Sequence, residues 1–218
     1  MLVAVDIGNT NIVLGFLDGD TIAGTYRITT KANHTSDEYG LFLTEFLRMS
    51  GFQPSDVDDV IICSVVPKVM HSFRSSIVKF LDIDPMVVGP GIKTGMNVRV
   101  DDPKSLGADI LADCAGAYYE YGGPVLVADF GTATTFNVID ENKVFRGGVI
   151  CPGLSTGLRA LGERCAQLPQ VHLSSPKSAI GVDTEKCMLS GSVLGTAVLL
   201  DGITQRIEEE LGRPATLV

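Results

Sequence analysis

The chain has 218 residues, 45% of them hydrophobic and 20% charged, which is enough for a substantial buried core in one large domain or two compact lobes. Its formal net charge of −9 at pH 7 and its pI near 4.7 exclude a protein that holds nucleic acid by neutralising phosphates with Lys and Arg. The same charge repels a nucleotide at long range, so a phosphate site in this chain must use backbone donors, a cation, or both.

The cysteines and the first residues predict a cytoplasmic protein. The cysteines are odd in number and include no C-x-x-C pair, which indicates reduced and mostly buried thiols. They are Cys63, Cys114, Cys151, Cys165 and Cys187. Only a few apolar residues precede Asp6, and we find no apolar run that approaches the length of a membrane span, so we expect neither a signal peptide nor a membrane partner.

The first part of the chain predicts a β-meander of three strands followed by α/β alternation. The strands run from Leu2 to Val5, from Ile12 to Leu17 and from Thr21 to Ile28. Thr35 and Glu38 form the sequence pattern of a capping box, which predicts a helix that stops at Gly51. A buried strand, a helix and a short strand should follow, over Val57 to Val66, Pro67 to Leu81 and Met86 to Val88.

The second part of the chain repeats the first. After a predicted loop from Gly89 to Lys104, a helix is expected over Gly107 to Tyr121 and a strand over Val125 to Asp129. Placing Asp6 over Asp129, an offset of 129 − 6 = 123, superposes Gly8 on Gly131 and Gly24 on Gly147. Two similar meanders predict a duplicated protein with an N-terminal lobe over residues 1–106, a C-terminal lobe over residues 107–218, and a cleft between them.

Two helices and a strand are expected in the remainder of the second lobe. The helices should cover Leu154 to Leu168 and Asp183 to Leu211, the second with one apolar face. The final Thr216-Leu217-Val218 has the composition of a strand that is just beginning. We therefore expect the second lobe to be truncated at its C-terminal end.

The first chemistry-bearing motif is the turn Asp6-Ile7-Gly8-Asn9-Thr10-Asn11. Its glycine would let the backbone approach a phosphate, the residues after it offer amide and hydroxyl donors, and Asp6 could hold a hydrated Mg²⁺. For a single copy, an ordinary hairpin with Asp and Asn as turn formers is the favoured interpretation.

The second motif, Asp129-Phe130-Gly131-Thr132-Ala133-Thr134-Thr135, has the same order of acid, glycine and hydroxyl groups. Its threonines supply side-chain donors around a tight turn, although threonine also simply favours strands. Two acid-x-glycine loops at equivalent places in duplicated meanders favour phosphate binding over two unrelated turns.

This pair of loops resembles the two phosphate motifs of the superfamily of actin, sugar kinases and chaperone ATPases. Within that superfamily the chain is similar to type III pantothenate kinase in the order and spacing of four segments. These are Asp6 to Val13, Leu106 to Asp109, Asp129 to Thr135, and Gly147 to Gly153. The resemblance implies two duplicated actin-like (ribonuclease H-like) lobes, each a mixed sheet with flanking helices. It also implies a homodimer that phosphorylates pantothenate with ATP to 4′-phosphopantothenate, the first step of coenzyme A biosynthesis.

The resemblance also assigns roles to residues. It implies that Asp109 is the base that takes the proton of the pantothenate hydroxyl, and that Asp129 binds a monovalent cation, K⁺ or NH₄⁺. The ATP-binding residues would be Asp6, Ile7, Gly8, Asn9, Thr10, Asn11, Ile12, Val13 and Thr132. The substrate-binding residues would be Gly107, Ala108, Asp109, Ile110 and Thr184. On the residues alone, Asp109 also fits the first turn of any helix, and Asp183 or Thr184 also fits an N-cap.

The chain departs from the family pattern in two places. Ile110 stands where the family has Arg after Gly-Ala-Asp, and Val100 stands where it tends to have Tyr. The family also continues through a strand, a glycine-rich turn that contacts adenosine, and a closing helix. These departures keep open a non-catalytic or regulatory relative of the same fold, because Arg donates to a carboxylate and Ile does not. A phosphohydrolase in which Asp109 orients water is a further, less favoured alternative.

Overall fold

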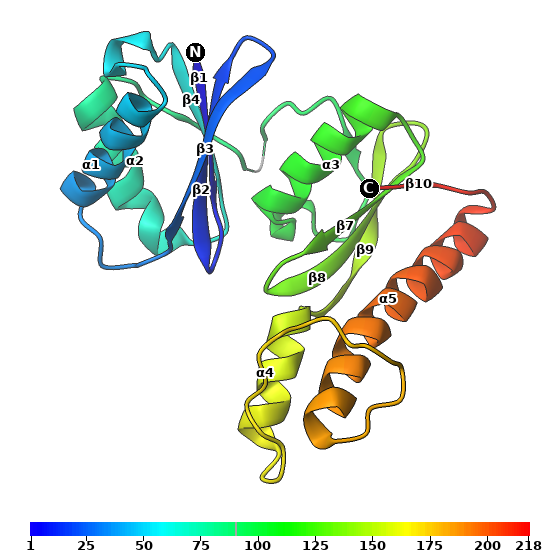
Figure 1. The fold of residues 1–218 in the computed structure, drawn as a ribbon. Coiled ribbons are helices and arrows are strands. Elements are labelled where there is room, and N and C mark those ends of the chain that lie inside the picture. The colour runs from blue at the N-terminus through cyan, green and yellow to red at the C-terminus, as the bar shows by residue number, and fades with distance from the viewer. Residues whose placement is uncertain (90) are drawn as a thin grey trace. The chain divides into compact units, whose positions relative to one another are not determined.

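A computed structural model describes residues 1–89 and 91–218 of the chain, and the chain divides into two compact units (Figure 1). The first unit comprises residues 1–94 and 104–112, and the second comprises residues 95–103 and 113–218. The boundary predicted between residues 106 and 107 lies in the region where the chain passes between the units, and it stays a prediction. The units are described separately.

The first unit contains a mixed five-stranded sheet with the order β3-β2-β1-β4-β5. Its strands are β1 (Leu2–Ile7), β2 (Asn11–Asp18), β3 (Thr21–Thr29), β4 (Asp59–Ser64) and β5 (Met86–Val87). The first three are antiparallel, as the predicted meander requires, whereas β4 and β5 add parallel pairings. Because burial along β1 alternates, Val5 and Ile7 lie on the core face while Asp6 lies on the opposite face.

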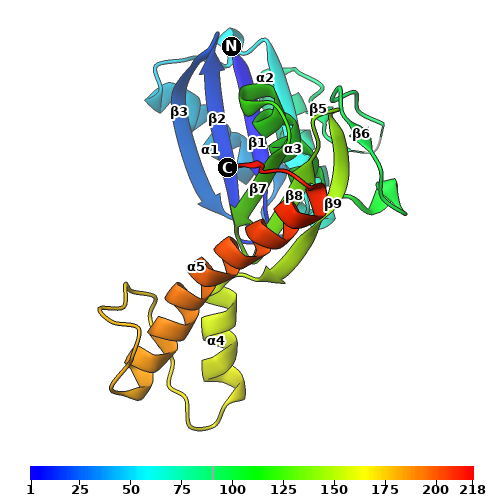
Figure 2. The same ribbon diagram turned by 90° about the vertical axis from the view of Figure 1, so that its right-hand side faces the viewer.

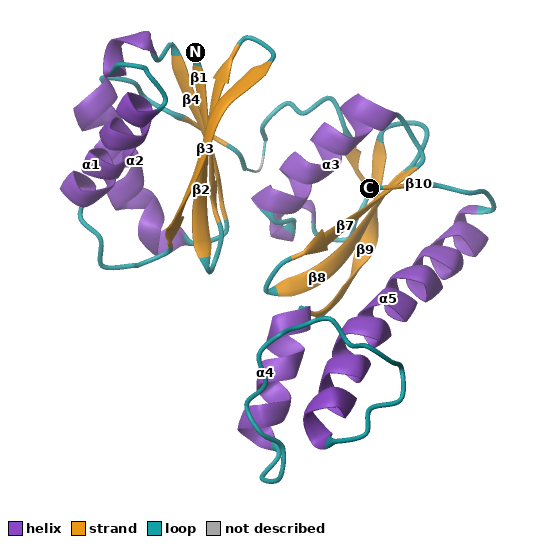
Figure 3. Ribbon diagram, viewed as in Figure 1, coloured by secondary structure: helices purple, strands orange, loops and turns teal. Residues whose placement is uncertain are grey.

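Two helices, α1 (Ser36–Met49) and α2 (Pro67–Leu81), cover the core face of this sheet (Figure 3). The predicted capping box is present, because Thr35 is the N-cap of α1 and both of its hydrogen bonds with Glu38 are formed. The bounds predicted for α2 are also confirmed. A short 3₁₀ helix, η1 (Pro54–Asp56), precedes β4.

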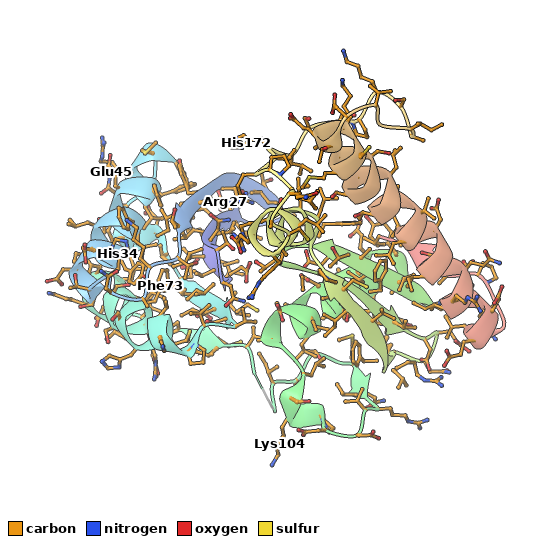
Figure 4. The ribbon with its side chains drawn as sticks, turned by 90° about the horizontal axis from the view of Figure 1, so that it is seen from below. Arg27, His34, Glu45, Phe73, Lys104 and His172 are labelled. Carbon is orange, nitrogen blue, oxygen red and sulfur yellow. The ribbon has the colours of Figure 1, made fainter. Side chains whose placement is uncertain are left out.

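Aromatic contacts tie the two helices of the first unit together. The ring of Phe73 on α2 lies 5.0 Å from the ring of Tyr39 on α1, and both side chains are 1% exposed. His34 lies at the edge of this core, 5.4 Å from Tyr39 between ring centres, while Glu45 lies on the exposed side of α1 (Figure 4). The first sheet is therefore held rigidly from one side by a packed core.

The second unit contains a mixed five-stranded sheet with the order β10-β7-β8-β9-β6. Its strands are β6 (Asn97–Val98), β7 (Val125–Phe130), β8 (Ala133–Ile139), β9 (Val144–Pro152) and β10 (Thr216–Leu217). β6 and the 3₁₀ helix η2 (Pro103–Ser105) fall in the segment that was predicted to be a loop from Gly89 to Lys104. Residue 90 of that segment lies outside the described residues. The strand expected at Thr216 is confirmed as β10, which pairs parallel with β7.

Three helices accompany the second sheet, and one of them spans the division between the units. They are α3 (Ala108–Tyr121), α4 (Leu154–Arg164) and α5 (Thr184–Leu211). α4 is shorter than predicted because the chain leaves the helix at Cys165, its C-cap, before Leu168.

α5 packs on two different partners along its length (Figure 2). In its first half, Met188 and Leu189 pack with Leu158 of α4. In its second half, one helix face packs on Leu126 and Phe136 of the sheet. The α5 residues on that face are Leu199, Leu200, Ile203, Ile207 and Leu211.

The middle of α5 has a second apolar face, whereas its last turns expose charged residues such as Asp201, Arg206 and Glu209. By length and composition this helix could cross a membrane, with a mean hydropathy of 1.5 in its most apolar window, of which 17% is buried. The expectation that no apolar run approaches a membrane span is wrong for this window. Because the helix also packs on the sheet and on α4, it has one core face and one uncovered apolar face, which includes Leu194 and Val198.

The two meanders share register and irregularities. Phe16 pairs with Gly24 in the first sheet, and Val138 pairs with Gly147 in the second. In each sheet the register shifts directly after that pair, between Phe16 and Leu17 and between Val138 and Ile139. β10 also pairs with β7 in parallel, as β4 pairs with β1. The predicted internal duplication is therefore confirmed.

All five cysteines are free thiols. Cys63 and Cys114 are buried, Cys151 is half-buried, and Cys165 and Cys187 are exposed. The prediction that most are buried is wrong, because the segment from Cys165 to Cys187 consists of a loop and a helix start that the sheet does not cover.

Candidate active site

The first loop connects β1 to β2 and is fixed by backbone contacts. Ile7 pairs with Ile12, which leaves residues 8–11 as the loop. The Gly8 N–H donates to the Asn11 carbonyl at 3.0 Å, which closes the turn. From the segment after β3, Thr30 donates its hydroxyl to the Gly8 carbonyl at 2.7 Å and its N–H to the Thr10 carbonyl at 3.0 Å.

The predicted ATP-binding residues of this loop differ in what their side chains can do. Ile7 and Ile12 are 0% exposed and belong to the core, so only their backbone could meet a ligand. Asp6, Asn9 and Thr10 are exposed, whereas Gly8, Asn11 and Val13 are half-buried. The structure therefore confines side-chain chemistry in this loop to the polar residues.

Asp6 lies on the sheet face that the helices leave uncovered. It pairs with Val13, which pairs in turn with Arg27, so the three side chains form one row on that face. Arg27 is the exposed basic member of the row (Figure 4). This face thus presents a carboxylate and a guanidinium beside the first loop.

The second loop connects β7 to β8 and is closed in a similar way. Phe130 pairs with Thr134, which leaves residues 131–133 as the loop. The Gly131 N–H donates to the Ala133 carbonyl at 2.9 Å. The Thr132 carbonyl accepts two hydrogen bonds, from the Gly153 N–H at 3.1 Å and from the Thr156 hydroxyl at 2.8 Å.

Gly131 and Gly153, the two glycines in the region of the second loop, differ in whether the fold leaves space for a side chain. A Cβ on Gly153 would overlap the carbonyl oxygen of Gly131 and lie 2.6 Å from that of Thr132, so the fold itself requires glycine there. A Cβ on Gly131 would lie 3.4 Å from the Ala133 oxygen and 3.6 Å from Asp129 Oδ2, which are ordinary contacts, and its φ is not positive. The fold leaves room for a methyl group at Gly131, so the reason for glycine lies outside the local packing.

Asp109 lies in the first turn of α3. Its Oδ1 accepts a hydrogen bond of 2.8 Å from the Ile110 N–H, and the Gly107 carbonyl accepts from the Leu111 N–H at 3.1 Å to start the helix. A Cβ on Gly107 would collide with Asp109 Oδ1. Glycine at this position therefore leaves the space that the Asp109 carboxylate occupies, and Ala108 separates the two.

Thr184 is the first residue of α5, and Asp183 is its N-cap. Lys186 donates two hydrogen bonds to Asp183, from its side-chain ammonium and from its backbone N–H. The ammonium contributes most, and together they lower the pKa of the Asp183 carboxyl below its usual range. Thr184 lies nine residues, or roughly 13 Å along the helix axis, before Val193, which shares a pocket with Gly131. Along its own chain, Thr184 is thus separated from the second loop.

That pocket adjoins the second loop. It has a volume of about 430 Å³ and lies among β7, α4, α5 and the segment between the two helices. Its lining is mostly apolar, with hydroxyl groups from Ser155 and Thr196. Such a lining suits an uncharged part of a small molecule.

The ion sites predicted at Asp6 and Asp129 would each depend on a single carboxylate. Across residues 1–89 and 91–218, no group of three His, Cys, Asp or Glu side chains could hold a metal ion. A single carboxylate still fits Mg²⁺ bound through water and phosphate oxygens, because Mg²⁺ keeps several waters and uses few protein ligands. The residues therefore fit ions that arrive with the nucleotide.

Sequence reasoning did not single out Thr30 or Thr156. Both residues bind loop carbonyls that are more than 20 positions away in the chain, at separations of 22 and 24 residues. Only the folded register brings these hydroxyls to the loops, so local sequence carries no signal for them.

Two mixed five-stranded sheets with flanking helices, each with an acid-x-glycine hairpin loop, define the fold of the actin-like ATPases. A profile of the family described as type III pantothenate kinase matches residues 2–206. The chain belongs to the type III pantothenate kinase family, whose members transfer phosphate to pantothenate.

Several relatives agree with this assignment. A type III pantothenate kinase of Bifidobacterium longum (strain DJO10A) is 81% identical over 191 residues, which are 88% of this chain and 75% of the relative. That of B. longum subsp. infantis is 58% identical over 218 residues, 100% of this chain and 86% of the relative. That of Agathobacter rectalis is 44% identical over 212 residues, 97% and 82% of the two chains.

Solved structures support the fold alone. A 2-dehydro-3-deoxygalactonokinase structure from Sinorhizobium meliloti aligns with a TM-score of 0.55 at 12% identity, covering 92% of this chain and 80% of the other. A structure from Campylobacter jejuni, described as a Baf family transcriptional activator, aligns with a TM-score of 0.54 at 17% identity, covering 92% and 78%.

Proposed function

We propose that this chain transfers the γ-phosphoryl group of ATP to the primary hydroxyl of pantothenate, with Asp109 as the base and the two hairpin loops as the phosphate grips. The observation that carries the proposal is the pairing of two closed loops in duplicated meanders with a carboxylate held at a helix start. Phosphoryl transfer needs mainly positioning and charge stabilisation, and these parts supply both.

Asp109 takes the proton as the substrate oxygen bonds to phosphorus. The bond from the γ-phosphorus to the bridging oxygen breaks, ADP leaves with that electron pair, and the hydroxyl proton goes to the carboxylate. Oδ1 accepts from the Ile110 N–H, which fixes the carboxylate orientation. Gly107 keeps the space beside Oδ1 free of a side chain.

The loops bind and orient the nucleotide. Polar groups of Asn9, Thr10 and Asn11 meet the phosphates in the first unit, and Thr132 meets them in the second. Asp6 would hold Mg²⁺ through a bound water, and Asp129 would hold a monovalent cation, K⁺ or NH₄⁺. When bound, these ions shield the phosphate charge, which an acidic protein of net charge −9 needs.

The substrate is held by the start of α3 and by Thr184. Ile110 offers an apolar contact where Arg would offer a charge, so recognition of the pantothenate carboxylate falls to other donors, of which exposed Arg27 is a candidate. Because Thr184 is far along α5 from the second loop of its own chain, its substrate contact fits a site completed by a second subunit.

We further propose a cytoplasmic homodimer formed through the uncovered face of α5. Val198 on this face is 69% exposed, and the exposed residues Gly191 and Gly195 allow close helix approach. Five free thiols fit a reducing compartment. Val198→Asp should convert dimer to monomer in light scattering after size exclusion, and a monomeric wild-type protein would refute the dimer.

The test of function is a coupled ADP-release assay with ATP, Mg²⁺ and K⁺, with and without pantothenate. We expect pantothenate-dependent turnover that Asp109→Asn lowers by at least about a hundredfold. Glu120→Gln, on the exposed end of the same helix, is the matched control and should retain turnover. Folded wild-type protein that binds ATP but never turns over would instead indicate a non-catalytic relative with an altered pocket at Val100 and Ile110.

A further inference from the structure

Two threonines outside the predicted motifs each donate a hydroxyl hydrogen bond to a carbonyl of one of the two loops. Thr30 donates its hydroxyl to the Gly8 carbonyl at 2.7 Å, and Thr156 donates its hydroxyl to the Thr132 carbonyl at 2.8 Å. Thr30 follows β3, and Thr156 lies in the first turn of α4. In both units, therefore, the element that follows the third strand of the meander returns a hydroxyl group to the loop between the first two strands.

This contact is not the usual one for threonine. In helices a threonine hydroxyl commonly donates to the carbonyl four residues earlier, as Thr44 does to Gly40 at 2.9 Å and Thr196 does to Ser192 at 2.6 Å. Thr156 lies in the first turn of α4, where the residue four positions earlier, Pro152, precedes the helix, and its hydroxyl reaches a carbonyl 24 residues away. The Thr156 hydroxyl therefore binds the loop and not its own helix.

The contact fixes which way the loop backbone faces. A peptide unit is planar and trans, so its C=O and the next N–H point in opposite directions. Holding the Gly8 carbonyl toward Thr30 turns the Asn9 N–H to the other side of that plane. The Thr132 carbonyl is held by the Thr156 hydroxyl together with the Gly153 N–H, and these two donors orient the peptide unit between Thr132 and Ala133.

The orientation of a loop peptide unit decides whether it attracts or repels a bound anion. A carbonyl oxygen that turns toward a phosphate repels it, whereas an N–H attracts it. A hydroxyl that donates a hydrogen bond to the carbonyl oxygen from the side opposite the phosphate keeps that oxygen turned away from the phosphate. The hydroxyl can do this without adding charge to the site.

We propose that Thr30 and Thr156 are positioning residues that set the ATP affinity of the two phosphate loops. The inference rests on the proposed function, because it takes the loops to be phosphate grips. Neither threonine needs to touch the nucleotide, since each acts through the peptide unit that it holds.

The test compares isosteric variants with conservative ones. Thr30→Val and Thr156→Val remove the hydroxyl and keep the shape, and Thr30→Ser and Thr156→Ser retain it. Thr44→Val is the matched control, because it removes a hydroxyl-to-carbonyl hydrogen bond of similar length that lies within helix α1 and contacts neither loop. Each purified variant is measured for the Kd of Mg·ATP by calorimetry, for KM of both substrates, and for Tm.

We expect each Val variant to raise the Kd and KM for ATP about five- to tenfold while KM for pantothenate stays within twofold. The Ser variants should recover wild-type ATP affinity. A purely structural role predicts something else, namely a lower Tm with an unchanged Kd for ATP, and that result overturns the inference.

The inference and the proposed function fail in different ways. If wild-type protein turns over and the Val variants bind ATP as tightly as Thr44→Val does, only the positioning role is refuted. If wild-type protein does not bind ATP at all, the loops are not phosphate grips and both proposals fall. If wild-type protein binds ATP without turnover and the Val variants bind it more weakly, the positioning role stands and only the catalytic proposal fails.

Discussion

A methyl group added at Gly131 should separate the fold from the function of the second loop. In Gly131→Ala the new Cβ would lie 3.4 Å from the Ala133 oxygen and 3.6 Å from Asp129 Oδ2, and the backbone is not in the left-handed region. The folded chain can therefore accept alanine. A phosphate that approaches the backbone at this point cannot keep the same distance once the methyl group is present.

The two expected effects have opposite signs. Replacing a compatible glycine by alanine stabilises a protein by about 0.4–1 kcal/mol, because the unfolded chain loses freedom. Losing one hydrogen bond to a charged phosphate costs about 1.5–3 kcal/mol, which is roughly a ten- to hundredfold rise in the Kd for ATP. Calorimetric titration with Mg·ATP measures the second quantity, and thermal unfolding checks the first.

Gly153→Ala provides the contrast. Its Cβ would overlap the Gly131 carbonyl and lie 2.6 Å from that of Thr132, so this variant should lower Tm as well as ATP binding. If Gly131→Ala binds ATP like the wild type while its Tm is maintained, no phosphate approaches this backbone and the second loop is not a phosphate grip.

Three further predictions concern stability and thiol chemistry. Asp140→Ala should lower the free energy of unfolding at pH 7 by about 2–3 kcal/mol. Burial acts to raise the pKa of Asp140, but hydrogen bonds from two backbone N–H groups and a guanidinium lower it overall, so its contribution is complete above about pH 4 and is lost as pH falls through the lowered pKa. An aromatic disulfide reagent at pH 8 should modify the exposed thiols of Cys165 and Cys187 at once. Burial, and to a smaller extent the Asp113 carboxylate, raises the pKa of the Cys114 thiol to about 12, so Cys114 should react only when the protein unfolds. Phe73→Ala should cost about 3–5 kcal/mol in denaturant titration and leave the Kd for ATP unchanged.

Each of these has a control and a contrary result. Asp84→Ala removes an exposed carboxylate from an ion pair and should cost at most about 1 kcal/mol. A stability deficit of Asp140→Ala that grows as the pH is lowered from pH 7 would contradict the linkage. Rapid reaction of Cys114 in folded protein would contradict its burial. Val78→Ala, on the exposed side of the same helix, should be nearly neutral, and an equal loss there would refute the assignment of Phe73 to the core.

Local signals in the sequence predicted most elements of the first unit. Thr35 and Glu38 predicted the start of α1 because a capping box uses only neighbouring residues. Pro67 predicted the start of α2 because proline has no N–H to leave unpaired in a first turn. The duplication was visible because both acid-x-glycine loops are short and keep their spacing from the strands that follow.

Features formed by distant segments could not be predicted in this way. β6 is two residues long and exists because Asn97 and Val98 pair with β9, nearly 50 residues later, so its own sequence has no strand pattern. The hydroxyl contacts of Thr30 and Thr156 depend on register in the same manner. The apolar composition of α5 was visible, but periodicity did not distinguish its core face from its uncovered face, because in the first two thirds of the helix both faces carry small and apolar residues.

Some residues of the candidate site could likewise be predicted from local sequence, and others could not. Asp6, Gly8, Asp129 and Gly131 could be proposed from spacing, since each acid lies near the end of a strand and each glycine directly follows that strand. Asp109 depended on resemblance, because an acid in a first helical turn is common, and the Gly107 contact that leaves room for its carboxylate exists only in three dimensions.

The two meanders also record how their lengths diverged. The first hairpin leaves residues 8–11 between paired strands and the second leaves 131–133, so one copy is a residue shorter at this point. The next turn reverses the difference, because residues 18–21 separate the pair Leu17 and Ile22 in the first copy, whereas residues 140–144 separate the equivalent pair Ile139 and Phe145 in the second. The shorter first hairpin of the second copy is thus matched by a longer second hairpin, and the offset of 123 is restored on the third strand. The two copies therefore differ in the lengths of both hairpins, while their first and third strands keep the same spacing along the sequence.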